Sequence, residues 1–97
     1  VVGLDRRPFA EVGVESVVLD LADGAAIDYF AARWRGAVDV LVNNAGVAGD
    51  SPAERVYLVN ALAPRRLTKA LFPRIPHGGA VITISSGAGW AYAERLA

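Results

Sequence analysis

The stretch that decides the fold is residues 39–46, DVLVNNAG, where an apolar run stops abruptly at two asparagines and a glycine. The run Val40–Val42 has no polar alternation, which predicts a strand that is buried on both faces of a sheet. The asparagines should then lie at the C-terminal end of that strand. In open α/β sheets this is the end at which ligands bind.

Three other apolar runs end in small polar or acidic residues in the same way. These runs are Val1–Leu4 before Asp5, Val17–Leu19 before Asp20, and Val81–Ile84 before Ser85 and Ser86. Parallel strands bring their carboxyl ends to one edge of a sheet, so the polar residues should form one site. The pattern favours an α/β fold with a doubly wound parallel sheet.

Two helices are expected between these strands. Asp23 is placed to cap the first, whose apolar stripe Ala26, Phe30 and Trp34 has helical spacing, and Gly36 is its stop signal. Ser51-Pro52-Ala53-Glu54 has the pattern of a capping box, which predicts a second helix over residues 52–72.

A proline interrupts the second predicted helix. Pro64 has no N–H, so the carbonyl of Asn60 should lose its helical partner. A freed carbonyl and an amide side chain at one mid-helix residue suggest a functional position at Asn60.

Composition narrows the classes of protein that remain. The chain has 97 residues, and 54% of them are apolar, which excludes a disordered tail. Its 10 basic and 10 acidic residues balance, so its charge gives no reason to expect binding to nucleic acid or to an anionic membrane. Without cysteine it has no disulfide or thiolate metal site, and we expect no metal and a reducing, cytoplasmic location. The absence of methionine suggests an internal segment of a longer protein.

Taken in order, the acidic strand ends and two further motifs resemble the short-chain dehydrogenase/reductase family. The motifs are Asn43-Asn44-Ala45-Gly46 and Ile84-Ser85-Ser86, the latter followed by Gly87-Ala88-Gly89. The resemblance covers essentially the whole chain, from the family's second strand to just beyond its fifth. It implies that residues 1–97 form a single, partial NAD(P)-binding domain of Rossmann type.

The resemblance also implies roles for individual residues. Asp5 would bind the adenosine ribose and favour NAD by repelling a 2′-phosphate, although Arg6 or Arg7 could make NADP acceptable. Ser86 would polarise the substrate oxygen, and Asn60 would hold a water through its main-chain carbonyl. The remaining cofactor-site residues would be Asp20 and Leu21 at the adenine, with Asn43, Ala45 and Gly46 along the cofactor.

Two features of the family are absent from this sequence, and a third departure from the family pattern points to one branch of the family. The chain has no Gly-rich first β–α turn, and no Tyr-x-x-x-Lys, because Tyr92 is followed four residues later by Leu96. The short separation of Gly46 from Asn60, together with the GAGW sequence, is similar to the compact bacterial branch that includes 3α-hydroxysteroid dehydrogenase/carbonyl reductase. In that branch extra residues separate the serine from the tyrosine.

The resemblance implies an NAD(P)-dependent oxidoreductase that moves a hydride between nicotinamide and a small secondary alcohol or ketone, steroids included. The alternative is a non-catalytic nucleotide-binding or scaffold protein of the same fold; a sugar-nucleotide epimerase is a weaker third reading. Taken singly, the motif residues could be plain turn or cap residues. The family also pairs into dimers or tetramers, through the helix that corresponds to residues 52–72.

The strand order of the family leaves a gap in this chain. Its first strand lies between its second and fourth, and that first strand is not in this sequence. We therefore expect no continuous four-stranded sheet, and we expect the 97 residues alone not to form a stable NAD-binding domain, because two apolar strand edges would be exposed.

Overall fold

The computed structural model describes residues 1–86, 94 and 95. The Gly87-Ala88-Gly89 motif and Tyr92 lie outside the described residues. So does most of the helix that the sequence suggests from Trp90 onward.

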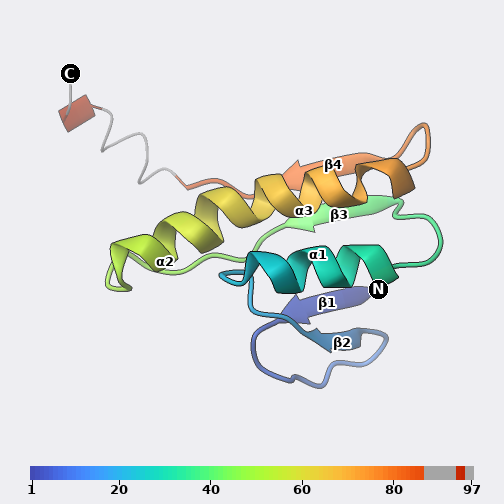
Figure 1. The fold of residues 1–97 in the computed structure, drawn as a ribbon, viewed down its shortest axis with the longest axis horizontal. Coiled ribbons are helices and arrows are strands. Elements are labelled where there is room, and N and C mark those ends of the chain that lie inside the picture. The colour runs from blue at the N-terminus through green and yellow to red at the C-terminus, as the bar shows by residue number, and fades with distance from the viewer. Residues whose placement is uncertain (87–93, 96–97) are drawn as a thin grey trace.

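The described residues contain four strands, and each overlaps the run that predicted it. Strand β1 pairs in parallel with β2, and β3 pairs in parallel with β4, in two separate two-stranded sheets. All four strands point the same way (Figure 1). The absence of a continuous four-stranded sheet from the described residues confirms the expected gap. The strands are β1 Val2–Asp5, β2 Glu15–Val18, β3 Val40–Asn43 and β4 Ala80–Thr83.

A cavity of about 710 Å³ separates the two sheets, with the consecutive residues of β1 and β3 along its sides. The carbonyls of Val1 and Asp5 accept bonds from the β2 segment, and that of Asn43 accepts one from Ile84. Backbone groups alternate in direction along a strand, so those of Leu4 and Val42 point into the cavity. Within the described part of the chain, the gap is thus bordered by unpaired strand edges on both sides.

The first helix, α1, spans Gly24–Arg33 and follows the prediction closely. The Asp23 side chain accepts a hydrogen bond of 3.1 Å from the Ala26 N–H and caps the helix. Gly36, just beyond the helix end, has φ +89°, a conformation that glycine adopts without steric cost. Both signals read from the sequence are therefore confirmed.

The second predicted helix is divided rather than continuous. Helix α2 spans Ala53–Tyr57, a π-helical turn η1 spans Leu58–Leu62, α3 spans Ala63–Leu71, and a 3₁₀ turn η2 spans Phe72–Arg74. The π-turn ends where Pro64, which lacks an N–H, would break an α-helical ladder. The predicted capping box is wrong, because Pro52 is the N-cap and no side chain of the described residues caps the helix.

Helices α1 and α3 pack against each other and cover one side of the strands (Figure 1). Both crossovers, β2 to β3 and β3 to β4, step in the same direction, and right-handed connections then place both helices on one face. Ile27 of α1 is 1% exposed at the centre of the resulting core. The core comprises Leu19, Ile27, Leu41, Ala63, Leu67 and Leu71.

The opposite face of the β3–β4 sheet is not covered by the described residues. Val40 and Val42 are 52% and 51% exposed, whereas Leu41 between them is buried. The expectation that this strand is buried on both faces is therefore wrong for this chain. The apolar run of β3 is suited to packing on both faces of the sheet, but the described residues supply a helix to only one of them.

Candidate functional site

The carboxyl ends of β1 and β2 meet the loop after β3 around one cavity of about 390 Å³. Five of the predicted cofactor-site residues lie in its wall, which supports the expected convergence of the strand ends. They are Asp5, Asp20, Leu21, Ala45 and Gly46. Their roles as cofactor ligands stay predictions.

Asp20, just after β2, is a polar group of this wall that is held from two different segments. Its Oδ1 accepts hydrogen bonds from the Ala22 N–H at 2.9 Å and from Arg55 Nη2 at 3.2 Å. Its Oδ2 lies 3.5 Å from Arg55 Nη1. The bond from Ala22, then that from Arg55, and the nearby charge of Arg6 hold the pKa of Asp20 below its ordinary value.

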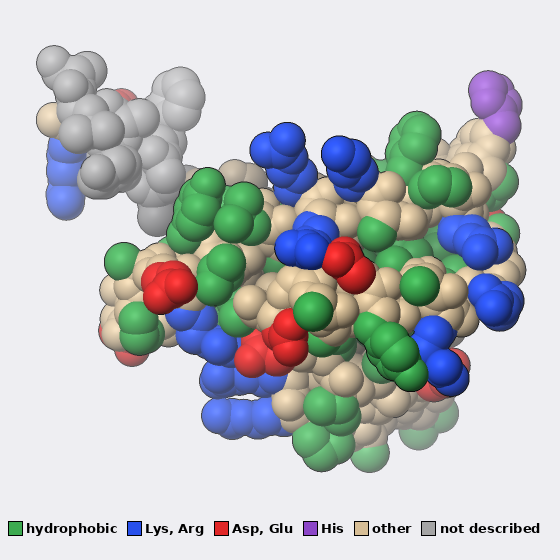
Figure 2. All heavy atoms as spheres, viewed as in Figure 1, with side chains coloured by type: hydrophobic (Ala, Val, Ile, Leu, Met, Phe, Trp, Pro, Cys, Tyr) green, Lys and Arg blue, Asp and Glu red, His purple; other side chains and the backbone are tan. Residues whose placement is uncertain are grey.

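Asp5 ends β1 at the rim of the same cavity. Its carboxylate accepts a 2.9 Å hydrogen bond from the Arg7 N–H, which closes a tight turn. Arg6, Arg7 and Arg55 all contribute to the wall. Figure 2 shows basic side chains gathered at this end of the molecule, between α2 and the loop after β1. The cavity therefore brings carboxylates and guanidinium groups together.

Asn60 holds the loop that carries Ala45 and Gly46. Its Oδ1 accepts from the Val47 N–H at 2.8 Å, and its Nδ2 donates to the Val47 carbonyl at 3.0 Å. The π-turn η1 presents this side chain to the loop. The sequence drew attention to the main-chain carbonyl of Asn60, and the role of its side chain in fixing Val47 was missed.

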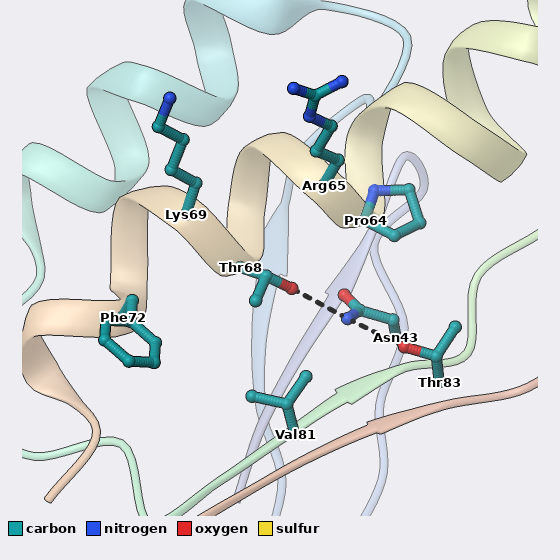
Figure 3. A pocket seen from close by; sticks show the side chains of 8 residues that line it. All are labelled: Asn43, Pro64, Arg65, Thr68, Lys69, Phe72, Val81 and Thr83. Atoms are coloured by element: carbon teal, nitrogen blue, oxygen red, sulfur yellow. Dashed lines mark hydrogen bonds between the residues drawn. The ribbon is translucent and has the colours of Figure 1, made fainter.

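Asn43, at the end of β3, faces away from this cavity and into the fold. Its Nδ2 donates to Thr68 Oγ1 at 3.0 Å and to Thr83 Oγ1 at 3.5 Å (Figure 3). These bonds tie β3 to α3 and to β4. Asn43 also lines a separate cavity of about 410 Å³ beside α3, with Arg65 and Lys69 at its edge.

Ser86 is exposed, three residues beyond the end of β4, and it is not part of the wall that contains Asp20. Its substrate-polarising role stays a prediction. Among residues 1–86, 94 and 95, no group of three or more His, Cys, Asp or Glu side chains could hold a metal ion. In the same part of the chain, no helix is both long enough and apolar enough to cross a membrane.

Arg55 is the site residue that sequence reasoning missed. It lies on α2, 35 residues from Asp20, and the two side chains form an ion pair with an N–O distance of 3.2 Å. No local pattern marks it, since Arg55 follows Glu54 in what reads as an ordinary helix start. Only the folded chain shows that the first turn of α2 closes over the end of β2.

Comparison with known proteins places this arrangement in a family. The family model described as short chain dehydrogenase matches residues 9–97. The chain belongs to the short-chain dehydrogenase family. Its parallel strands and one-sided helices form part of the Rossmann-type fold of that family, as the sequence predicted.

Individual members show how far the likeness extends. Coniferyl-alcohol dehydrogenase of a Pseudomonas species is 33% identical over 96 residues, which are 99% of this chain and 38% of that protein. A short-chain dehydrogenase from Streptomyces avermitilis has a TM-score of 0.69 at 34% identity, covering 91% of this chain and 40% of the other. E. coli BdcA, solved with NADPH, has a TM-score of 0.69 at 29% identity, covering 79% and 34%. The chain thus spans about two-fifths of the length of these relatives.

Proposed function

We propose that this protein is an NAD(P)-dependent oxidoreductase that transfers a hydride between nicotinamide and a secondary alcohol or ketone. The observation that carries the proposal is the single cavity in which Asp5, Asp20 and Gly46 meet from three strand ends. Such an edge is where open α/β sheets bind dinucleotides. The family, which the comparisons establish, supplies the hydride chemistry.

In this proposal the β1–β2 side of the cavity holds the adenosine half of the cofactor. Asp5 accepts hydrogen bonds from the ribose hydroxyls, and Asp20 with Leu21 receives the adenine. The loop that contains Ala45 and Gly46 follows the cofactor toward its nicotinamide, and the bonds from Asn60 to Val47 keep that loop in place. The nicotinamide supplies or accepts the hydride, and the protein orients it.

Asn43, Asn60 and Ser86 complete the proposed machinery. Asn43 fixes the end of β3 through its bonds to two threonines. Ser86 donates a hydrogen bond to the substrate oxygen and stabilises the charge that develops there. The main-chain carbonyl of Asn60 holds a water. Steroids or other ketones are the substrates that the compact branch suggests.

We propose NAD as the main cofactor and NADP as an accepted one. The Asp5 carboxylate would repel a 2′-phosphate, whereas Arg6 and Arg7 beside it would attract one. The crystal structure of BdcA in complex with NADPH supports the proposal that this protein also accepts NADP. Affinities of the intact protein for NAD and NADP, with and without Asp5→Asn, test the balance: removing the carboxylate should shift the preference toward NADP.

The decisive experiment measures cofactor binding and turnover in the intact protein. Calorimetry should show that NAD binds, and alcohols should reduce it, as followed by the absorbance of the reduced nicotinamide. Ser86→Ala should lower turnover by about 100-fold without weakening NAD binding, because it removes one donor to the developing charge. Ser85→Ala is the matched control. Binding without turnover of any alcohol or ketone would favour the non-catalytic scaffold instead.

Two further parts of the proposal concern the setting of the protein. Tyr57 and Phe72, both within the segment 52–72, are 60% and 67% exposed, and they support pairing of copies through this segment. The homodimer or homotetramer is tested by sedimentation of the intact protein. The lack of cysteine in the sequence supports a reducing compartment such as the cytoplasm.

A further inference from the structure

We infer that Arg55 is a positioning residue that aims the Asp20 carboxylate at the exocyclic amine of a purine, and so makes the cavity select a 6-amino purine over a 6-oxo purine. The inference rests on the proposed nucleotide-binding function and deepens it. It concerns a residue that nothing in the sequence singled out. Three observations carry it, and each concerns the geometry around Asp20.

The first observation is that the two oxygens of Asp20 are used unequally. Oδ1 is occupied by the Ala22 N–H and by Arg55 Nη2, at 2.9 and 3.2 Å. Among the residues that the structure describes, Oδ2 has only the long 3.5 Å approach of Arg55 Nη1. A carboxylate oxygen can accept two hydrogen bonds, so Oδ2 keeps room for another donor.

The second observation is that the pair is held from two separate elements. The Ala22 bond fixes the carboxylate from its own strand end, and Arg55 fixes it from α2. The side chains of Arg55 and Asp20 are 27% and 44% exposed, so the pair lies at the wall rather than out in solvent. The planar fork of an arginine sets the plane of a carboxylate, which a point charge cannot do.

The third observation is the character of the wall around the pair. Leu19, Leu21 and Val59 line the same cavity and give its wall an apolar character. A flat base can lie against such surface while its edge reaches Asp20. An ionised carboxylate can only accept hydrogen bonds. At that edge it therefore binds an amine and repels a carbonyl oxygen.

The test compares reduced NAD with its hypoxanthine analogue, which carries a carbonyl in place of the adenine amine. Binding to the intact protein is measured by calorimetry for both. The wild-type protein should prefer the adenine form by about tenfold or more, the factor expected for one charge-assisted hydrogen bond. Arg55→Met should reduce that preference to within about threefold, because the Ala22 bond alone holds one oxygen and does not set the plane of the carboxylate. Arg55→Lys should restore little of it, since an ammonium has no fork.

The controls separate this inference from a merely structural effect. Arg65 lies on α3, and its side chain lines the separate cavity of about 410 Å³ beside that helix. Arg65→Met should therefore leave the preference for adenine unchanged. Asp20→Asn should abolish the preference, because an amide can both donate and accept. An Arg55→Met protein that keeps the full preference, or a wild-type protein that binds both forms equally, overturns the inference and leaves the proposed function standing. Failure of the wild-type protein to bind either form overturns both.

Discussion

Replacing Asn60 with alanine should loosen the loop that carries Ala45 and Gly46 while the helices stay intact. The substitution deletes both bonds to Val47, one at 2.8 Å and one at 3.0 Å. Each neutral hydrogen bond contributes about 0.5–1.5 kcal/mol, and the lower half of that range applies because both are exposed. The free energy that holds the loop should therefore fall by about 1–2 kcal/mol.

Hydrogen exchange of the Val47 amide reads this quantity directly. A loss of 1–2 kcal/mol should speed the exchange of that amide by about 5- to 30-fold. Asn60→Asp separates the two bonds. The carboxylate still accepts from the Val47 N–H, so the amide should stay protected, while the carbonyl of Val47 loses its donor and faces a negative charge.

Arg65→Ala is the control for a general effect on the second helix, because Arg65 is an exposed residue of the neighbouring α3. It should leave the exchange of Val47 unchanged. If Asn60→Ala changes that exchange by less than about twofold, the two bonds do not hold the loop and the reasoning is refuted. Equal acceleration by Asn60→Asp would show that the N–H bond is not the one that protects the amide.

Three further results are expected. Leu67→Ala, at a side chain 4% exposed, should cost the intact protein about 2–5 kcal/mol in urea unfolding, and Leu67→Met less than about 1.5; similar midpoints for the two would contradict the core described above. The hydrogen bond from Arg66 lowers the pKa of Asp28 below its ordinary value of 3.8. The stability lost in Asp28→Asn should therefore be constant at neutral pH and should shrink as the pH falls below about 4 through the folded-state pKa. A loss that grows in acid would contradict the assignment. In the 97-residue chain the Val42 amide, which faces the gap, should exchange at least about tenfold faster than in a protein whose gap is filled by a strand, and equal rates would refute the open edge.

The strands and the first helix could be predicted because their signals are local. The apolar run before Asn43 and the cap at Asp23 need only a few neighbouring residues to act. The gap between the two sheets could be predicted as well, since strand order follows from the family that the motifs resemble. The open face of β3 could not, because an apolar run indicates that both faces pack without saying which partner supplies each.

The second helix shows where local signals compete. Ser51, Pro52 and Glu54 have the capping-box spacing, yet the chain begins α2 at Ala53 with no side-chain cap. Pro64 correctly marked a disturbance in the helical ladder, but the sequence did not predict that the turn before it would widen to a π-turn. That widening presents Asn60 to Val47, so the proline has a consequence at the site.

Contacts between distant segments were beyond the reach of the sequence. The bond from Arg55 to Asp20 depends on where α2 lies over the end of β2, and that position is set by packing throughout the core. The same is true of the Arg66–Asp28 pair between α3 and α1. Composition marks such arginines as surface residues, and only three-dimensional placement separates a site residue from a solvated one.

The gap between the sheets gives the proposed dinucleotide a structural consequence as well as a chemical one. Asp5 and Asp20 belong to one half of the molecule, and Ala45 and Gly46 belong to the other. A cofactor that contacts both halves links them. Because it binds only when the two halves are correctly placed, its binding free energy stabilises that placement. At a free concentration of about 100 times Kd this linkage is worth about 2.7 kcal/mol, so loading and rigidity should rise and fall together.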